Sequence, residues 1–303
     1  MINRHFLNAF IMITLMVYPS QENLSAETAS SSSDGASSST GNGFCLRDNV
    51  SNISVKPNDA KGATLSFSQD RIKNNGNTWN STGVLGYRVD INPYTSWLIP
   101  AVSWNVSRTA GSPDKNVEEL EFSLPVTLKQ PLYTNDPALL SLTARPYYLT
   151  DFSFADEIYG VEASAEFIGR LFGPQGLYLG GYYNPNQNEP IQYQLRAVPK
   201  IDYSVTQKGG DHTVRQPGDD WFRAGGMTSL DILFNNIFEV SVSYEYRGVV
   251  SGNGLNVHLF TSSGKYWLDP NKNVAIKLGY SKGQSLETAQ NVDLLTLSFE
   301  WKK

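Results

Sequence analysis

An imidazole and two hydroxyls stand close together near the C-terminal end, where His258 precedes Ser262 and Ser263. A serine nucleophile needs a base within hydrogen-bond distance. On a strand each residue rises about 3.3 Å, so residues four or five positions apart lie too far from each other for a direct bond. Parity places His258 inward together with Asn256. We interpret it as a polar residue of an interior wall, and the sequence predicts no enzymatic activity.

The sequence is equally poor in residue patterns that could bind a metal or a cofactor. On a strand, Glu119 and Glu121 share one face about 6.6 Å apart, and ion pairs with Arg and Lys explain them more simply than a cation does. The segment "GGDHTVRQPGDD" lacks calcium-loop spacing and reads as a solvated loop. A "GNG" at Gly252–Gly254 is typical of a hairpin turn. The lone Cys45 excludes an intrachain disulfide. We expect no metal and no cofactor.

Composition and the N-terminal residues restrict the class of protein further. The net charge of −5 gives no basic field for nucleic acid. Residues 1–26 have the layout of a cleaved signal peptide: a basic start, a 13-residue apolar run from Phe6 to Tyr18, then small residues. Residues 27–61 form a predicted flexible leader and lead-in segment rich in Ser and Gly. Residues 62–303 form the predicted folded domain, in which no stretch is apolar enough for a transmembrane helix.

The elements that must position these side chains are strands with two unlike faces. In "NNIFEVSVSYEYRG" one register, from Phe238 to Tyr246, is apolar and aromatic, and the other, from Glu239 to Arg247, is polar. A period of two indicates a strand whose faces meet different environments. Similar segments recur to the C-terminus between turn signals, and they predict about twelve strands, with a range of 10–14.

A soluble sandwich and a membrane barrel both produce alternation, so three further features decide between them. The run Ile191–Val205 alternates for fifteen residues, longer than sandwich strands usually are. The apolar registers carry no charge, as expected of a face that meets lipid. Aromatic residues gather toward strand ends, as at a membrane interface. These aromatic residues are Tyr147, Tyr148, Tyr182, Tyr183, Tyr244, Tyr246, Tyr280 and Trp301.

The prediction therefore divides the strand residues into two sets. The predicted lipid-facing residues are Leu120, Phe122, Leu124, Tyr193, Leu195, Phe238, Val240, Val242, Tyr244, Leu278, Leu297 and Phe299. The predicted lumen-lining residues are Arg88, Glu119, Glu121, Lys129, Arg145, Glu162, Glu166, Arg196, Lys200, Asp202, Glu239, Glu245, Arg247, His258, Lys277 and Glu300.

With a signal peptide and the terminal strand "LLTLSFEW", the chain resembles the bacterial outer-membrane β-barrel class. The resemblance covers roughly residues 78–303 and implies an all-β, closed antiparallel transmembrane β-barrel in the outer membrane, surrounded by membrane lipid. It also implies that the barrel-assembly machinery reads the C-terminal strand. Members of the class usually end on an aromatic residue, whereas here Lys302 and Lys303 follow Trp301.

The loops and the function follow from this architecture. With both barrel ends in the periplasm, the turns "FNN" and "LDPNKN" lie there, and "TQKGGDHTVRQPGDDW", "SKGQSLETAQN" and the tight "FGPQG" lie outside. We expect a small porin-like channel for polar solutes with a narrow charged lumen. The alternatives are a sealed structural barrel that presents its loops to a surface partner, a lipid-modifying outer-membrane enzyme, and a secreted soluble β-sandwich.

Overall fold

The computed structural model describes residues 43–47, 63–70, 77–92, 96–109, 117–133, 136–170, 177–180, 190–209, 216–269, 274–284 and 291–301. Among these residues every regular element is a β-strand. None of them forms a helix of the length and apolarity needed to cross a membrane. The strands are β1 (Gly43–Arg47), β2 (Ala63–Asp70), β3 (Asn77–Asn92), β4 (Ser96–Leu98), β5 (Ala101–Thr109), β6 (Val117–Ser123), β7 (Val126–Tyr133), β8 (Asp136–Thr150), β9 (Glu157–Arg170), β10 (Tyr178–Leu179), β11 (Ile191–Lys208), β12 (Asp220–Phe234), β13 (Phe238–Gly252), β14 (Val257–Trp267), β15 (Val274–Gln284) and β16 (Asn291–Trp301).

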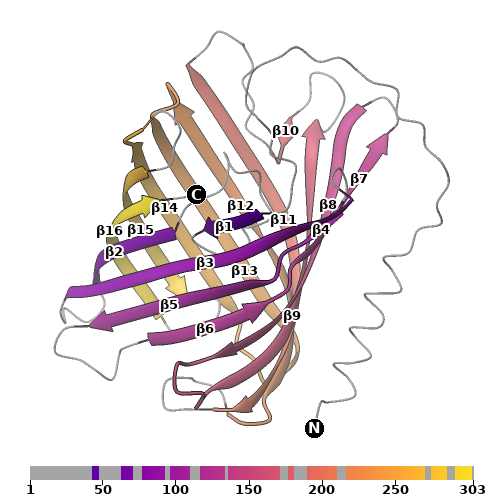
Figure 1. Cartoon of the computed structure of the whole chain (residues 1–303), viewed down its shortest axis with the longest axis vertical. Coiled ribbons are helices and arrows are strands. Elements are labelled where there is room, and N and C mark those ends of the chain that lie inside the picture. Colours follow the sequence, from indigo (N-terminus) through magenta and orange to yellow (C-terminus); the bar gives the residue numbers. More distant parts are fainter. Residues whose placement is uncertain are drawn as a thin grey trace. The chain divides into compact units, whose positions relative to one another are not determined.

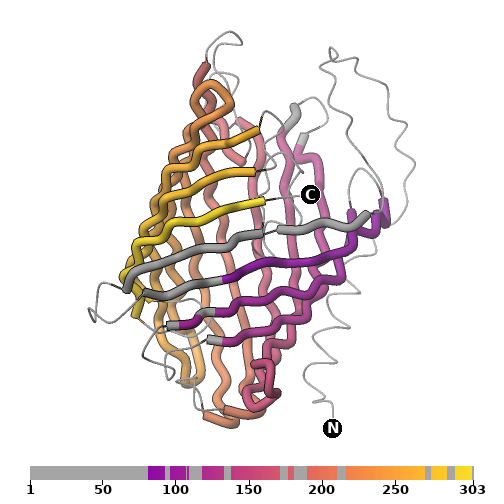
Figure 2. The backbone as a smooth tube through the Cα atoms, turned by 60° about the vertical axis from the view of Figure 1, so that its left-hand side comes forward, coloured from indigo at the N-terminus to yellow at the C-terminus, as the bar shows by residue number. Residues whose placement is uncertain are grey.

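These strands pair into a closed antiparallel circuit (Figures 1 and 2). From β11 to β16 each strand pairs with the next, and β16 pairs with β2 and β2 with β3. The circuit closes because β9 pairs with β8 on one edge and with β11 on the other. Closure removes the free edges that an open sheet would expose.

Twelve strand positions make up the circuit in the described part of the chain. The strands β4 and β5 together occupy the position beside β3. The strands β6 and β7 together occupy the following position, between β4 and β5 on one side and β8 on the other. The short β1 pairs with β3 beyond the residues that β2 occupies. The predicted all-β, closed antiparallel barrel of about twelve strands is therefore confirmed.

Prolines interrupt two of these positions along one line across the wall. Pro100 separates β4 from β5, and Pro125 separates β6 from β7. Proline lacks an N–H, so a ladder tolerates it only where the bond is not needed. The proline carbonyls still accept bonds, from Tyr87 to Pro100 at 3.0 Å and from Ile99 to Pro125 at 2.9 Å. In Figure 1, β5 and β6 lie toward the lower left and β4 and β7 toward the upper right.

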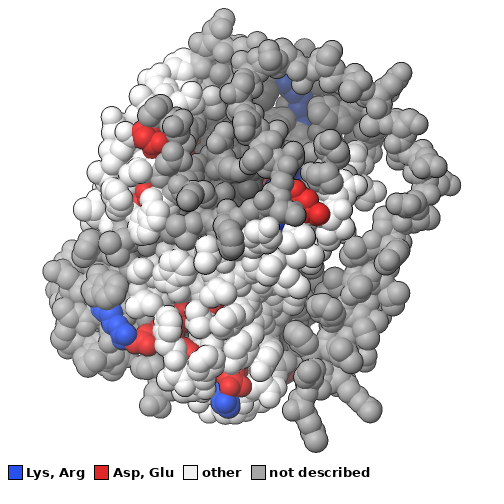
Figure 3. Space-filling model, in the orientation of Figure 1, with Lys and Arg blue, Asp and Glu red and all other residues white. Residues whose placement is uncertain are grey.

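The faces of the wall are inverted relative to a soluble protein. Leu278 and Leu297, paired across β15 and β16, are 55% and 53% exposed on the outside. Lys265 and Glu300, on the opposite face of the same region, are each 1% exposed. Figure 3 shows that the described part of one side is mainly uncharged, with Lys, Arg, Asp and Glu in small groups. An apolar outside around a charged inside is the organisation of a barrel built for lipid.

The strand order also places the connections at the two rims. The turn at residues 235–237 and the connection from β14 to β15 lie at the rim where β16 ends, as predicted. Asn235 and Asn236 make this turn tight by adopting positive φ values of 51° and 58°, which asparagine tolerates. The connections after β8, β11 and β13 lie at the opposite rim.

The predicted place of "FGPQG" outside stays a prediction, because this turn lies outside the described residues. Strand β9 ends and strand β11 begins at the rim where β16 ends, and the described residues between them include the two-residue β10. The predicted signal peptide and most of the leader lie outside the described residues and stay predictions. Within the leader, Gly43–Arg47 form β1.

Candidate functional site

The inner wall carries a row of charged side chains that face one another across neighbouring strands. Arg145 on β8 pairs in register with Glu162 on β9, and Glu162 pairs with Asp202 on β11. Asp202 pairs in turn with Arg223 on β12. Residues directly opposite in an antiparallel ladder point to the same face, so register alone gathers these four groups. Glu121 of β6 extends the row through a 2.5 Å contact with Arg145.

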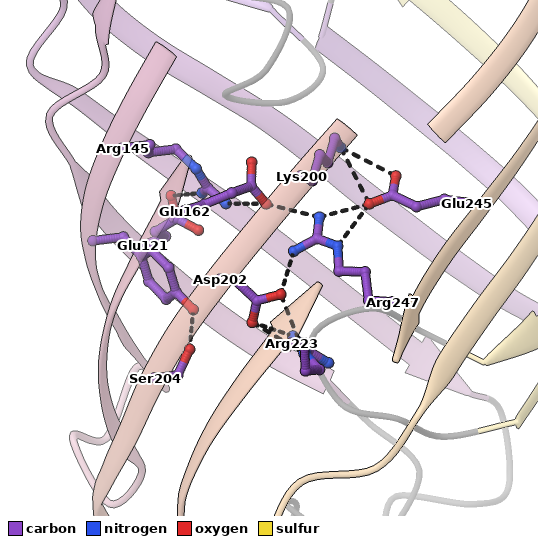
Figure 4. Close-up of polar contacts among 10 residues, drawn as sticks. Glu121, Arg145, Glu162, Lys200, Asp202, Ser204, Arg223, Glu245 and Arg247 are labelled. Carbon is purple, nitrogen blue, oxygen red and sulfur yellow. Dashed lines mark hydrogen bonds and ion pairs between the residues drawn. The ribbon is translucent and has the colours of Figure 1, made fainter. Parts of the chain in front are cut away.

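Arg247 of β13 lies at the centre of this cluster (Figure 4). Its guanidinium contacts Glu162 at 2.7 Å, Asp202 at 3.2 Å and Glu245 at 2.6 Å. Lys200 reaches the same Glu245 from β11 at 3.1 Å. Arginine suits such a position because its planar donors serve several carboxylates together. One side chain thereby links β9, β11 and β13.

A glycine makes this reach possible. Gly225 of β12 lies in register between Lys200 and Arg247 and carries no side chain into the space between them. A Cβ there would lie 1.9 Å from the carbonyl oxygen of Tyr246. The close approach of β12 and β13 therefore requires glycine at this position.

A second cluster continues the charged wall around β13 to β16. Lys265 of β14 lies 2.8 Å from Glu300 and 3.6 Å from Glu239. Lys277 of β15 contacts the other oxygen of Glu300 at 3.3 Å. The ammonium of Lys265 also lies 4.8 Å from the ring centre of Trp267, a cation–π contact. The cluster holds two cations and two carboxylates.

Further pairs hold other parts of the wall. The ladder between β9 and β11 stops at Lys200 opposite Ser164. Beyond that point Arg196 binds Glu166 through two contacts of 2.6 and 3.1 Å. This paired fork of donors and oxygens bridges strands that no longer share backbone bonds.

Beside the proline line, Trp97 lies between two cations. Arg88 is 4.4 Å from its ring centre and Lys129 is 4.9 Å from it. Arg88 also binds Asp90 at 2.6 Å. Lys129 and Arg88 thus lie together. The predicted lumen residue Glu119 of β6 accepts a 2.8 Å bond from Asn105 of β5.

Two sequence assignments need correction. His258 pairs in register with Tyr246 and is exposed, so it lies on the outer face and not in the lumen. Both registers of β14 contain apolar residues, and only its pairing with β13 shows which is inward. Tyr147 lies on the inner face, where its hydroxyl and that of Ser204 share a 2.6 Å hydrogen bond above Gly160.

Sequence reasoning missed two buried cations, Arg223 and Lys265, which are 5% and 1% exposed. The sequence does contain a signal for Arg223, because Trp221 and Arg223 lie on one face of β12 and Phe222 lies on the other. Lys265 lies two residues before Trp267 and therefore shares its face of β14, but the residue pattern of this strand alone does not show which face is inward.

Eleven of the twelve predicted lipid-facing residues lie on the outer register of their strands, and Leu124 lies between β6 and β7. Seven of them are at least 40% exposed: Phe122, Phe238, Val242, Tyr244, Leu278, Leu297 and Phe299. Five are less exposed: Leu120, Leu124, Tyr193, Leu195 and Val240. Their contact with lipid stays a prediction.

Among the ion pairs of the described residues, those on the inner face run along the wall and none spans the barrel. Among the described residues, each inner pair joins groups on one strand, on neighbouring strands or on strands up to three positions apart. The longest reach is from Arg247 on β13 to Glu162 on β9. Opposite sides of a twelve-position circuit lie six positions apart. No group of three or more His, Cys, Asp or Glu side chains suited to a metal occurs in the described ranges.

Comparison with known proteins gives similarities of structure alone. No protein-family model matches the chain. No curated protein matches its sequence. A NanC porin structure is 9% identical with a TM-score of 0.45, covering 80% of this chain and 100% of that one. A KdgM porin in complex with disordered oligogalacturonate is 10% identical with a TM-score of 0.40, covering 79% and 98%. LpxR from Salmonella typhimurium is 10% identical with a TM-score of 0.39, covering 79% and 99%. Scores below 0.5 carry no inference about this chain's solute or activity.

Proposed function

We propose that the protein is a porin-like channel of the bacterial outer membrane that passes small polar solutes. The observation that carries the proposal is the charged inner wall, whose ion pairs run along the wall. Pairs that crossed the interior would close it, whereas pairs along the wall leave its centre to water and solute. The apolar outer face suits membrane lipid, and a strand-built wall satisfies its backbone groups without water.

A sealed barrel is the second candidate, and a specific observation favours it. Asp202, Lys265 and Glu300 are each 1% exposed, so water has little access to these parts of the wall. A barrel of this kind serves as a scaffold that presents the loops of one rim to a partner. The two candidates predict opposite results in one measurement.

That measurement is single-channel conductance in planar lipid bilayers. Purified protein refolded in detergent, and checked for folding by heat-modifiable mobility on a gel, is added to one side of the membrane. Discrete current steps above the detergent background support the channel. Folded protein without such steps removes the channel and leaves the sealed barrel.

The lipid-modifying alternative has a separate test. His258 and Ser262 lie on the outer face of β14, four positions apart, and register places Ser262 opposite Val242 and Tyr280. This spacing of about 13 Å is too long for direct activation of the hydroxyl. Hydrolysis of phospholipid by the purified protein that disappears in His258→Ala would revive this alternative.

A further inference from the structure

The paired charges of the inner wall are equal in number. Eight basic residues take part in inner ion pairs among the described residues: Arg88, Arg145, Arg196, Lys200, Arg223, Arg247, Lys265 and Lys277. Eight acidic residues are their partners: Asp90, Glu121, Glu162, Glu166, Asp202, Glu239, Glu245 and Glu300. The wall is dense in charge, yet its paired part has no net charge.

The spacing of these charges limits how far their field extends. Every inner pair joins nitrogen and oxygen within 3.6 Å, the distance from Lys265 to Glu239. Two opposite charges this close act as a dipole on a solute several ångströms away. The residual field is screened by salt over about 8–10 Å at ordinary ionic strength. An ion beside these pairs therefore meets little net attraction or repulsion from them. Lys129, Glu119 and Asp231, which also lie on the inner face and are not counted in these pairs, add one net negative charge.

Hydrogen-bonding groups remain available on the same wall. The side chain of Arg88 is 23% exposed and that of its partner Asp90 is 8% exposed. Lys277 is 22% exposed, whereas its partner Glu300 is 1% exposed. In these two pairs the basic side chain is thus more exposed than the carboxylate that it contacts. Such a surface offers bonds to acceptor oxygens without a net positive field.

We infer that this wall selects for solutes without net charge. The class is small neutral or zwitterionic polar molecules, and small cations and anions are distinguished only weakly. The inference rests on the proposed channel and adds its solute class. It follows from the balance of the pairs and not from any single residue.

The experiment is a reversal potential in a potassium chloride gradient, measured on single channels of the wild-type protein. We expect the permeabilities of potassium and chloride to agree within about twofold. Conductance with a preference of about tenfold or more for either ion overturns the inference and leaves the channel standing. Absence of conductance overturns both.

Variants test whether balance is the cause. Arg247→Met removes the cation that contacts Glu162, Asp202 and Glu245, and it should shift the permeability ratio toward potassium. The double variant with Glu245→Gln restores equal numbers and should return the ratio toward the wild-type value. Lys277→Met gives the same shift at a more exposed side chain if the first variant does not fold. Ratios that stay unchanged in the folded variants contradict the inference.

Solute flux provides the complementary measurement. Liposome swelling with arabinose and glycine, which carry no net charge, is compared with swelling in lysine and glutamate salts of similar size. Faster entry of the uncharged pair supports the inference. Faster entry of either charged solute contradicts it.

Discussion

At the scale of single residues, the absence of a side chain is as important as the charges. Gly225 lets Lys200 and Arg247 approach the carboxylates around them, because nothing projects between the two cations. Removing one partner of a buried ion pair destabilises a protein strongly, by about 3–5 kcal/mol. The glycine therefore contributes to a network whose members depend on one another.

We predict that Gly225→Ala destabilises the barrel by about 1–3 kcal/mol, since a Cβ would lie against the backbone of β13. The matched control is Gly279→Ala on the inner face of β15, where the nearest atoms to a Cβ are 3.8 Å away. Urea unfolding of both variants in detergent, followed by tryptophan fluorescence, measures the difference. Equal midpoints for the two variants would show that the close approach is not required.

Single residues also show where sequence reasoning reaches its limit. The inward positions of Glu239 and Arg247 follow from alternation, because one register of their strand is wholly apolar. In β14 both registers are mixed, and the assignment of His258 failed there. Which carboxylate meets Arg247 depends on the register between strands, and the alternation of one strand fixes only which of its residues face inward.

At the scale of elements, the turn between β8 and β9 is held by one carboxylate. Asp151 accepts bonds from the Ser153 hydroxyl at 2.6 Å and the Ala155 N–H at 2.7 Å. Partial burial raises the pKa of Asp151, but these bonds outweigh burial and leave the pKa below its ordinary value of 3.8. A lowered pKa contributes stability above the ordinary pKa, and that stability is lost as the pH falls through the folded value.

The predicted result is a carboxyl titration of Asp151 with a midpoint below 3.8, followed by the ¹³C chemical shift of the labelled protein in detergent micelles. Ser153→Ala removes one donor and should move the midpoint upward. Loss of order in this turn should accompany the titration. A midpoint at or above 3.8 in the wild-type protein would contradict the role of these bonds.

Strand number and antiparallel order were predictable from the sequence, because long alternating runs separated by turn residues leave few other arrangements. The path from β9 to β11 was not. Among the described residues between β9 and β11 only Tyr178–Leu179 form a strand, although the sequence around them is rich in aromatic and apolar residues. Local propensity does not determine whether a short strand crosses the wall or ends within it.

At the scale of the whole molecule, the apolar outer face and the charged inner face determine in which environment the protein is stable. A charge introduced on the outer face should be costly at mid-height and tolerated near a rim. Leu278 lies at the middle of β15, and Val250, which is 63% exposed, lies near the end of β13.

We predict that Leu278→Arg lowers the free energy of unfolding in lipid vesicles by about 2–4 kcal/mol and that Val250→Arg lowers it by about 0–1 kcal/mol. The measurement is urea-dependent folding into vesicles, read from heat-modifiable mobility. In water with detergent absent, both proteins should aggregate. Equal losses at the two sites would argue against a hydrocarbon layer centred on the middle of the strands.

The line of prolines across β4 to β8 has a consequence for the motion of the wall. Pro100 and Pro125 donate no amide hydrogen, and Pro146 accepts from Leu124 at 3.1 Å on the same line. A ladder with missing donors opens locally at lower free energy than its intact neighbours. Deuterium should therefore enter the amides beside these prolines well before it enters those of β12 and β13. The backbone pairing on this side of the cylinder would open transiently while the pairing of β12 and β13 persists.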